Sequence, residues 1–123
     1  MKKILVAEDS ESFLKLLVYW LKSEGYETVT VLRGDKVLEA FTEQKPDLVI
    51  LDGLLPMKNG FEAAKEIREL PSGKNVPIVL LTGVYKESEY YKYSQQIGVN
   101  LHYDKSSFKE KEFLAEVKKL LTT

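Results

Sequence analysis

The 123-residue sequence contains no cysteine, which excludes disulfide bonds, cysteine-based metal sites and thiol catalysis and fits a reducing compartment. It also lacks a long apolar run. The residues after Met1-Lys2-Lys3 stay apolar only from Ile4 to Ala7, which is too short for a signal peptide. No stretch approaches the roughly 20 apolar residues that span a bilayer. We therefore expect a cytoplasmic protein that does not associate with membranes.

Charge of one sign is not concentrated anywhere in the chain. The sequence has 18 basic and 19 acidic residues, and no basic run is longer than a pair. Proteins that bind nucleic acid usually carry a clustered basic surface, so direct nucleic-acid binding is not expected. The length is that of one domain, and we expect residues 1–123 to form a single one.

The segment from Asp47 to Asp52 is the most informative in the chain. Its apolar residues, 48–51, are too few for a helix and show no polar alternation, so they predict a strand buried on both faces. Such strands lie in the middle of parallel sheets. Asp52 then stands at the carboxyl end of this strand, where open α/β sheets bind their ligands.

Strand and helix patterns alternate along the whole chain. Helical spacing of apolar residues follows a candidate N-cap at Ser10, and a Ser-x-x-Glu capping box from Ser107 to Glu110 predicts the start of the last helix. The predicted strands are residues 4–7, 27–31, 48–51, 77–81 and 99–103, and the predicted helices are 12–24, a segment from 35, 61–70, 86–97 and 107–121. This order predicts a doubly wound, five-stranded parallel sheet with helices on both faces, a (βα)5 flavodoxin-like fold.

Polar residues follow four of these strands, and the carboxyl ends of parallel strands meet at one edge of a sheet. We expect Glu8, Asp9, Asp52, Thr82 and Lys105 to gather there. Clustered carboxylates repel one another unless a cation intervenes, and ligands that are all oxygen favour Mg²⁺. A carboxylate can also act as a nucleophile toward phosphorus, so we expect Asp52 to accept a phosphoryl group that Thr82 and Lys105 help to bind.

With these motifs the chain resembles the CheY-like receiver domain of two-component response regulators over essentially its whole length. The residues that carry the resemblance are Glu8-Asp9, Asp52, Pro56, Gly60, Thr82, Gly98 and Lys105. The resemblance implies that Asp52 is the phosphoacceptor and that Mg²⁺ is held by Glu8, Asp9, Asp52 and the backbone carbonyl of Leu54. It further implies a phosphorylation-controlled switch, not an enzyme with a separate substrate, that assists its own phosphorylation and dephosphorylation.

The same resemblance implies a set of partners. A histidine kinase or a phosphotransfer protein would donate the phosphoryl group, and a downstream protein, a fused output domain or a second phosphorylated copy would receive the signal. The receiving face would be formed by the fourth helix, the fifth strand and the fifth helix. Tyrosine is enriched at interfaces, so we take the tyrosines of this region as candidates for the partner face: Tyr90, Tyr91, Tyr93 and Tyr103.

Two positions depart from the family pattern. His102 stands three residues before Lys105, where the family usually has an aromatic switch residue, and Ser106 replaces the usual proline after the lysine. His102 can be a switch residue or an uncoordinated surface histidine. A peptide bond before serine strongly favours the trans form, because a cis bond without proline costs about 3–4 kcal/mol.

Other functions remain to be weighed. A pseudo-receiver would keep the fold as an interaction module without phosphoryl chemistry, and the changes at His102 and Ser106 leave that alternative open. Phosphohydrolases with an aspartyl nucleophile generally carry a second Asp two residues later, where this chain has Leu54. A flavin-binding protein needs a phosphate loop after its first strand, where Glu8 and Asp9 would repel a phosphate.

Overall fold

The computed structural model describes residues 1–83, 89–107 and 109–122, except for the side chains of residues 90 and 91. Its centre is one parallel sheet of five strands in the order β2-β1-β3-β4-β5. The predicted fold is thereby confirmed, with the apolar run before Asp52 in the central strand. The strands are β1 (Lys3–Ala7), β2 (Glu27–Val31), β3 (Leu48–Asp52), β4 (Ile78–Thr82) and β5 (Leu101–Asp104).

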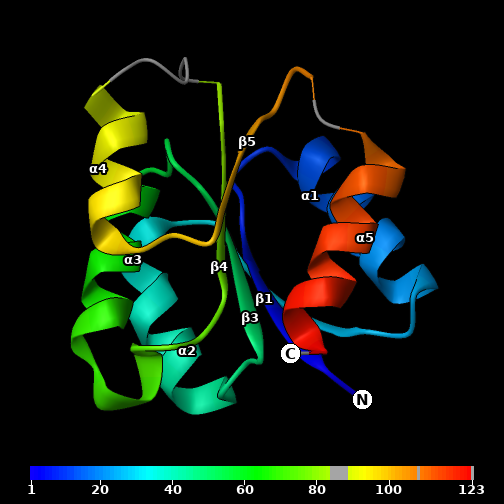
Figure 1. The fold of residues 1–123 in the computed structure, drawn as a ribbon, viewed down its shortest axis with the longest axis horizontal. Coiled ribbons are helices and arrows are strands. Elements are labelled where there is room, and N and C mark those ends of the chain that lie inside the picture. The colour runs from blue at the N-terminus through cyan, green and yellow to red at the C-terminus, as the bar shows by residue number, and fades with distance from the viewer. Residues whose placement is uncertain (84–88, 108, 123) are drawn as a thin grey trace.

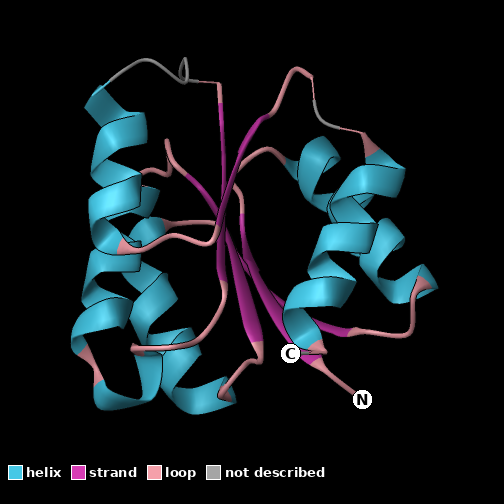
Figure 2. Cartoon of the chain, viewed as in Figure 1, coloured by secondary structure: helices cyan, strands magenta, loops and turns pink. Residues whose placement is uncertain are grey.

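Helices cover both faces of the sheet, as Figures 1 and 2 show: α2, α3 and α4 lie on one side, and α1 and α5 lie on the other. The α-helices are α1 (Glu11–Ser23), α2 (Val37–Gln44), α3 (Gly60–Glu69), α4 (Glu89–Ile97) and α5 (Glu110–Leu121), and two short 3₁₀ helices are η1 (Gly34–Lys36) and η2 (Pro71–Gly73). None of the helices in the described ranges has the length and apolar character needed to cross a membrane.

The sheet separates two apolar clusters because neighbouring strand residues point to opposite faces. In β1, Leu5 and Ala7 belong to the cluster under α2 and α3, whereas Ile4 and Val6 belong to the cluster under α1 and α5. Every residue of β3 is buried, as predicted for a strand covered on both faces. Each fully buried aliphatic side chain contributes about 1.5–3 kcal/mol, so the two clusters hold the sheet and helices together.

The helix starts show where local sequence signals succeed and where they fail. Ser10 is the N-cap of α1, as predicted, and its hydroxyl accepts a hydrogen bond from the backbone N–H of Phe13. The predicted capping box is wrong, because α5 begins at Glu110 and its N-cap residue, Lys109, makes no side-chain cap. Ser107 lies instead in the turn after β5, where its N–H donates to the carbonyl of Asp104.

Two other boundaries differ from the predicted ones. The described part of α4 begins at Glu89, and residues 86–88 of the predicted helix lie outside the described residues. The last strand begins at Leu101 and not at Val99, because the N–H of Val99 still donates to the carbonyl of Ser94 in α4. Both differences leave the order of the elements unchanged.

Two glycines allow the loops at the carboxyl end of the sheet to pack closely. A Cβ atom on Gly60 would lie 2.2 Å from the carbonyl oxygen of Asp52, so only glycine lets α3 begin directly beside the end of β3. A Cβ atom on Gly34 would lie 1.5 Å from the carbonyl oxygen of Lys58. These contacts fix the loop after Asp52 against its neighbours.

Candidate functional site at the carboxyl end of the sheet

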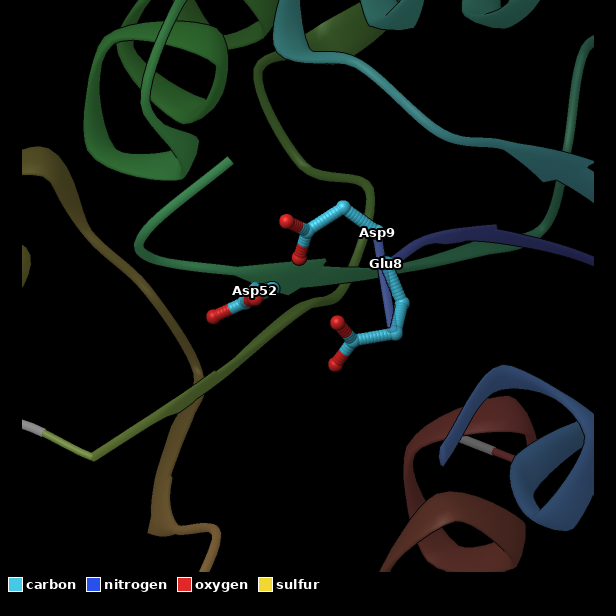
Figure 3. Close-up of side chains that lie close together, drawn as sticks. All are labelled: Glu8, Asp9 and Asp52. Carbon is cyan, nitrogen blue, oxygen red and sulfur yellow. The ribbon is translucent and has the colours of Figure 1, made fainter. Parts of the chain in front are cut away.

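Three carboxylates gather at the carboxyl ends of the two central strands. Glu8 and Asp9 follow β1, and Asp52 ends the adjacent strand β3, as Figure 3 shows. Ala7 pairs with Leu51, so the sheet register places Glu8 beside Asp52. One oxygen from each carboxylate lies within 4.8 Å of the others. The predicted gathering of these acids is therefore present, at the point where the strand order reverses.

Backbone hydrogen bonds orient the two buried carboxylates. Glu8 is 1% exposed and Asp52 is 4% exposed. The N–H of Ser10 donates to Oε2 of Glu8 over 3.0 Å, and the N–H of Leu54 donates to Oδ1 of Asp52 over 3.1 Å. Each carboxylate thus has one oxygen held by the backbone of the loop that follows it. Asp9, in contrast, is exposed.

Lys105 links the two buried acids. Its Nζ lies 2.7 Å from Oε1 of Glu8 and 3.4 Å from Oδ2 of Asp52, although the lysine comes from the loop after β5 at the far side of the sheet. Its backbone N–H donates to the carbonyl of Thr82 over 3.0 Å. This hydrogen bond continues the pairing of β4 with β5 and holds the lysine at the same edge as the acids.

The environment shifts the pKa values of Glu8 and Lys105 in the same direction. Burial raises the pKa of the Glu8 carboxyl and the charge of Asp52 adds to the rise, against the hydrogen bonds from Lys105 and Ser10. For Lys105, burial alone would lower the pKa of the ammonium. Its hydrogen bond with Glu8 and the charges of both acids outweigh burial, so the pKa of Lys105 is raised and the ammonium stays charged.

Thr82 completes the set of predicted side chains at this edge. It is the last residue of β4, it is fully buried, and its strand pairs with β3 so that Asp52 lies opposite Leu81. A Cβ atom on Gly53 would lie 3.2 Å from the Thr82 hydroxyl oxygen. The Thr82 hydroxyl therefore lies close to Gly53, the residue that follows Asp52.

The loop after Lys105 accommodates the missing proline without a cis bond. Every described peptide bond is trans. The N–H and the hydroxyl of Ser106 both donate to Oδ1 of Asp104, over 2.9 and 2.7 Å, and these bonds close a turn around Lys105. A proline at position 106 would lack this N–H, so the turn here is held by a side-chain interaction that proline could not make.

His102 and Tyr103 lie on opposite faces of β5, and the other candidate partner residues belong to α4. His102 Nδ1 is 3.4 Å from the buried hydroxyl of Ser94 in α4, and Tyr103 on the opposite face donates a hydrogen bond to Glu116 in α5. Tyr93 stacks on Phe61, with ring centroids 6.2 Å apart, and packs against the core. The side chains of Tyr90 and Tyr91 lie outside the described residues. The switch role of His102 and the partner role of the tyrosines stay predictions.

Phe13 is a member of the site that the sequence reasoning missed. The Nζ atom of Lys105 lies 4.6 Å from the centroid of the Phe13 ring, and both residues line an open groove beside the carboxylates. In the sequence, Phe13 is one of the apolar residues at helical spacing after Ser10, and that pattern alone predicts a core residue. The available signal was its place in the first turn of α1, because a helix that follows a strand starts at the carboxyl end of the sheet.

The donor set of this edge fits a divalent metal ion with a preference for oxygen. Glu8, Asp9 and Asp52 offer carboxylate oxygens alone, and Lys105 forms ion pairs with Glu8 and Asp52. Oxygen ligands of this kind suit Mg²⁺, which usually keeps several water ligands. The carbonyl of Leu54 stays a predicted ligand; its residue lies in the loop directly after Asp52, and its side chain is 56% exposed.

Comparison with known proteins identifies the family of this fold and site. Residues 4–118 match the family profile described as the response regulator receiver domain.

The chain is 39% identical over 119 residues to the phosphate regulon transcriptional regulatory protein PhoB of Rhizobium meliloti strain 1021. That match covers 97% of this chain and 52% of PhoB. It is 36% identical over 121 residues to the alkaline phosphatase synthesis transcriptional regulatory protein PhoP of Bacillus subtilis strain 168, covering 98% and 48%. The chain thus spans about half the length of these relatives.

Solved structures show the same similarity. The receiver domain of the sensor histidine kinase PA1611 of Pseudomonas aeruginosa PAO1, solved with a magnesium ion coordinated in its active site cleft, superposes with a TM-score of 0.89 at 27% identity over 99% of this chain and 98% of that one. The BeF3-activated receiver domain of Klebsiella pneumoniae RstA gives 0.88 at 30% identity over 99% and 100%. The chemotaxis response regulator CheY4 of Vibrio cholerae gives 0.88 at 27% identity over 98% of both chains.

Proposed function

The chain belongs to the family of response regulator receiver domains of two-component systems, and from this premise we propose that it is a phosphoacceptor switch in which Asp52 receives the phosphoryl group. One observation carries the proposal: the Asp52 carboxylate lies in one cluster with the carboxylates of Glu8 and Asp9, and the Lys105 ammonium lies 3.4 Å from its Oδ2. Negative and positive groups are therefore in place around a single nucleophile.

In the proposed reaction, Oδ2 of Asp52 attacks the phosphorus of a phosphohistidine on a histidine kinase or phosphotransfer protein. A P–O bond to Asp52 forms, the P–N bond of the donor breaks, and its electron pair returns to the histidine ring. Oδ1 is engaged with the N–H of Leu54, which leaves Oδ2 on the side of Lys105 as the attacking atom. The product is an aspartyl phosphate.

The remaining side chains neutralise the charge of the transferred group. Lys105 would exchange its contact with Asp52 for one with a phosphoryl oxygen, and the Thr82 hydroxyl would donate to another. Glu8, Asp9 and Asp52 would hold Mg²⁺, which neutralises negative charge on the phosphoryl oxygens when it is bound. The magnesium ion in the related PA1611 domain supports this assignment.

The partners follow from the same proposal. The curated relatives are transcriptional regulators about twice as long as this chain, which supports an output domain or a downstream protein as the receiver of the signal. A pseudo-receiver is not supported, because Glu8, Asp9, Asp52, Thr82 and Lys105 are all present at one edge. We place the protein in the cytoplasm as part of this proposal, with no catalytic role beyond its own phosphorylation and dephosphorylation.

The test is phosphorylation by a small phosphodonor. We expect the protein to gain the mass of one phosphoryl group with acetyl phosphate and Mg²⁺, and to gain nothing when EDTA removes the metal. Asp52→Asn should abolish the gain, whereas Asp47→Asn, the same change at the other end of β3, should keep it. An unmodified wild type, or a phosphorylated Asp52→Asn, would contradict the proposal.

A further inference from the structure

The Lys105 ammonium has a third neighbour besides the two acids. The face of the Phe13 ring lies 4.6 Å from Nζ, compared with 2.7 Å to Oε1 of Glu8 and 3.4 Å to Oδ2 of Asp52. The ring belongs to α1, the acids follow β1 and end β3, and the lysine follows β5. The ammonium, which belongs to the loop after β5, thus lies among groups from three other segments of the chain.

The ion pairs alone do not explain why the ammonium stays near Asp52. A lysine side chain has four flexible carbons, and its head group is strongly hydrated. The shorter contact is the one with Glu8, and the side chain of Lys105 is 24% exposed. An open groove lined by Phe13, Leu16, Gly83 and Ser106 adjoins it. Without a side chain that blocks this groove, the ammonium would be free to rotate into the groove and become hydrated.

The Phe13 ring lies on this side of the ammonium. A cation over an aromatic face is attracted by the negative charge of the π system, and the attraction grows when water is excluded. Phe13 also packs against the apolar cluster under α1 and α5, so its own position is held by the core. The ring can therefore fix the ammonium without an exchangeable proton or a charge of its own.

The local sequence ties the ring to the acid that shares the ammonium. The N–H of Ser10 donates to Glu8, and the hydroxyl of Ser10 accepts from the N–H of Phe13. One capping residue thus orients both the carboxylate and the first turn of the helix that carries the ring. Glu8, Ser10 and Phe13 are thus linked by hydrogen bonds, and Glu8 and Phe13 both contact the Lys105 ammonium.

We propose that Phe13 is a positioning residue that holds the Lys105 ammonium beside Asp52 for phosphoryl transfer. The proposal rests on the proposed function of Asp52 and adds a residue to its machinery. Phe13 does not touch the phosphoryl group and acts only through the lysine. Its effect on the reaction must therefore vanish when Lys105 is absent, which a purely structural role of the ring would not require.

A double-mutant cycle tests this dependence. The rate of phosphorylation by acetyl phosphate at saturating Mg²⁺ is measured by intact mass for wild type, Phe13→Leu, Lys105→Met and the double variant. Phe13→Leu should slow the wild-type reaction by about two- to thirtyfold, the range expected for a cation–π contact. In the Lys105→Met background it should have no further effect, and Phe13→Tyr should keep the wild-type rate. Equal slowing in both backgrounds would overturn the proposal.

Leu16→Ala is the matched control, because Leu16 lines the same groove and is 41% exposed. It should leave the rate unchanged. Proton NMR gives a second readout that needs no phosphorylation: the ring should shift the ε-methylene signals of Lys105 upfield in wild type and Phe13→Tyr, and the shift should disappear in Phe13→Leu. Unshifted signals in wild type would overturn the contact itself.

The two proposals fail in distinguishable ways. A wild type that accepts no phosphoryl group overturns the proposed function, and with it the role of Phe13 in the reaction. A phosphorylated wild type in which Phe13→Leu slows both backgrounds equally overturns only the inference about Phe13.

Discussion

At the carboxyl end of the sheet, the Lys105 ammonium meets the buried carboxylates of Glu8 and Asp52, whereas at the amino end the Arg68 guanidinium meets oxygens that carry no charge. Arg68 extends from the last turn of α3 and donates to the backbone carbonyls of Gly73, Val76 and Gly98 and to the amide oxygen of Asn100, over 2.6–3.0 Å. Asn100 in turn accepts from the N–H of Ile78 at the start of β4.

The two ends of the sheet therefore treat a partly buried cation differently. Burial lowers the pKa of Arg68, and the guanidinium is stabilised by hydrogen bonds to uncharged oxygens. At the other end, burial and the charge of Asp52 raise the pKa of Glu8. The two neighbouring negative charges therefore lower the stability of the folded protein. The proposed function requires this site to bind a metal ion and a phosphoryl group, and a site with that function cannot have all its negative charge neutralised beforehand. At the amino end, the hydrogen bonds of Arg68 serve only the stability of the fold.

The largest expected effect is at the amino end. Arg68→Met should lower the free energy of unfolding by about 2–3 kcal/mol, because several charge-assisted hydrogen bonds are lost together and their carbonyl acceptors stay partly buried. Lys65→Met removes the same charge from an exposed position of the same helix and should change stability by less than about 0.5 kcal/mol. Urea unfolding measures both. Equal effects of the two changes would remove the contrast between the ends.

Magnesium should act at the carboxyl end only. A Mg²⁺ concentration ten times the Kd should raise the free energy of unfolding by about 1.4 kcal/mol, because the metal binds the folded state alone. EDTA should reverse the effect. Arg68→Met should keep this response in full and Asp52→Asn should lose most of it. A response to Mg²⁺ that survives in Asp52→Asn would place the metal elsewhere.

Tyr103 offers a third case, in which a neutral phenol donates to the Glu116 carboxylate. Burial and this hydrogen bond raise the pKa of Tyr103 above its usual value of 10.0. A raised folded pKa contributes stability that is present below pH 10 and is lost as the pH rises above it, by about 1 kcal/mol over the first pH unit. Tyr103→Phe should be less stable than wild type at neutral pH and should lose less stability in alkali. Parallel pH profiles of the two proteins would contradict this.

Asp52→Asn should stabilise the metal-free protein by about 1 kcal/mol, because it removes one of two neighbouring buried carboxylates. The free energy of unfolding should thus rise in Asp52→Asn, whereas it should fall in Arg68→Met. Asp47→Asn, at the amino end of the same strand, should not stabilise, because Asp47 accepts a hydrogen bond from the N–H of Lys3. Unfolding in EDTA gives the comparison, and a destabilised Asp52→Asn would show that the acids are not in conflict.

The smallest effect concerns backbone strain at the two ends. Met57, in the loop after Asp52, has φ +71°, and Lys45, just before β3, has φ +50°, which side chains other than glycine seldom adopt. Met57→Gly and Lys45→Gly should each raise the free energy of unfolding by about 0.5 kcal/mol. Thermal unfolding tests the sign. Met57 is 74% exposed, so a loss of stability in Met57→Gly would mean that its side chain makes a contact worth more than the strain.

The sequence predicted the fold well because the signals it depends on are local. The all-apolar run of β3 and the helical spacing after Ser10 each act over a few residues, and the structure confirms both. The position of Asp52 at a strand end was also enough to predict that the acids gather there. The alternation of strands and helices predicted the parallel sheet with helices on both faces.

Contacts between distant residues could not be predicted in this way. Arg68 meets Gly98 and Asn100 about thirty residues later, and nothing in the helical pattern of α3 distinguishes it from an exposed basic residue. The contact of Phe13 with Lys105 is of the same kind. The capping box at Ser107 failed for a local reason, because Ser107 lies in the turn after β5, where its N–H donates to the carbonyl of Asp104, and α5 begins only at Glu110.

The most direct test of the central claim locates the phosphoryl group chemically. Borohydride reduces an acyl phosphate to an alcohol, so a phosphorylated aspartate becomes homoserine, whereas a phosphorylated serine or threonine is not reduced. After phosphorylation with acetyl phosphate and Mg²⁺, peptide mass mapping should find homoserine at position 52 and intact aspartate at position 9. Homoserine elsewhere, or a phosphoryl group that resists reduction, would contradict the account.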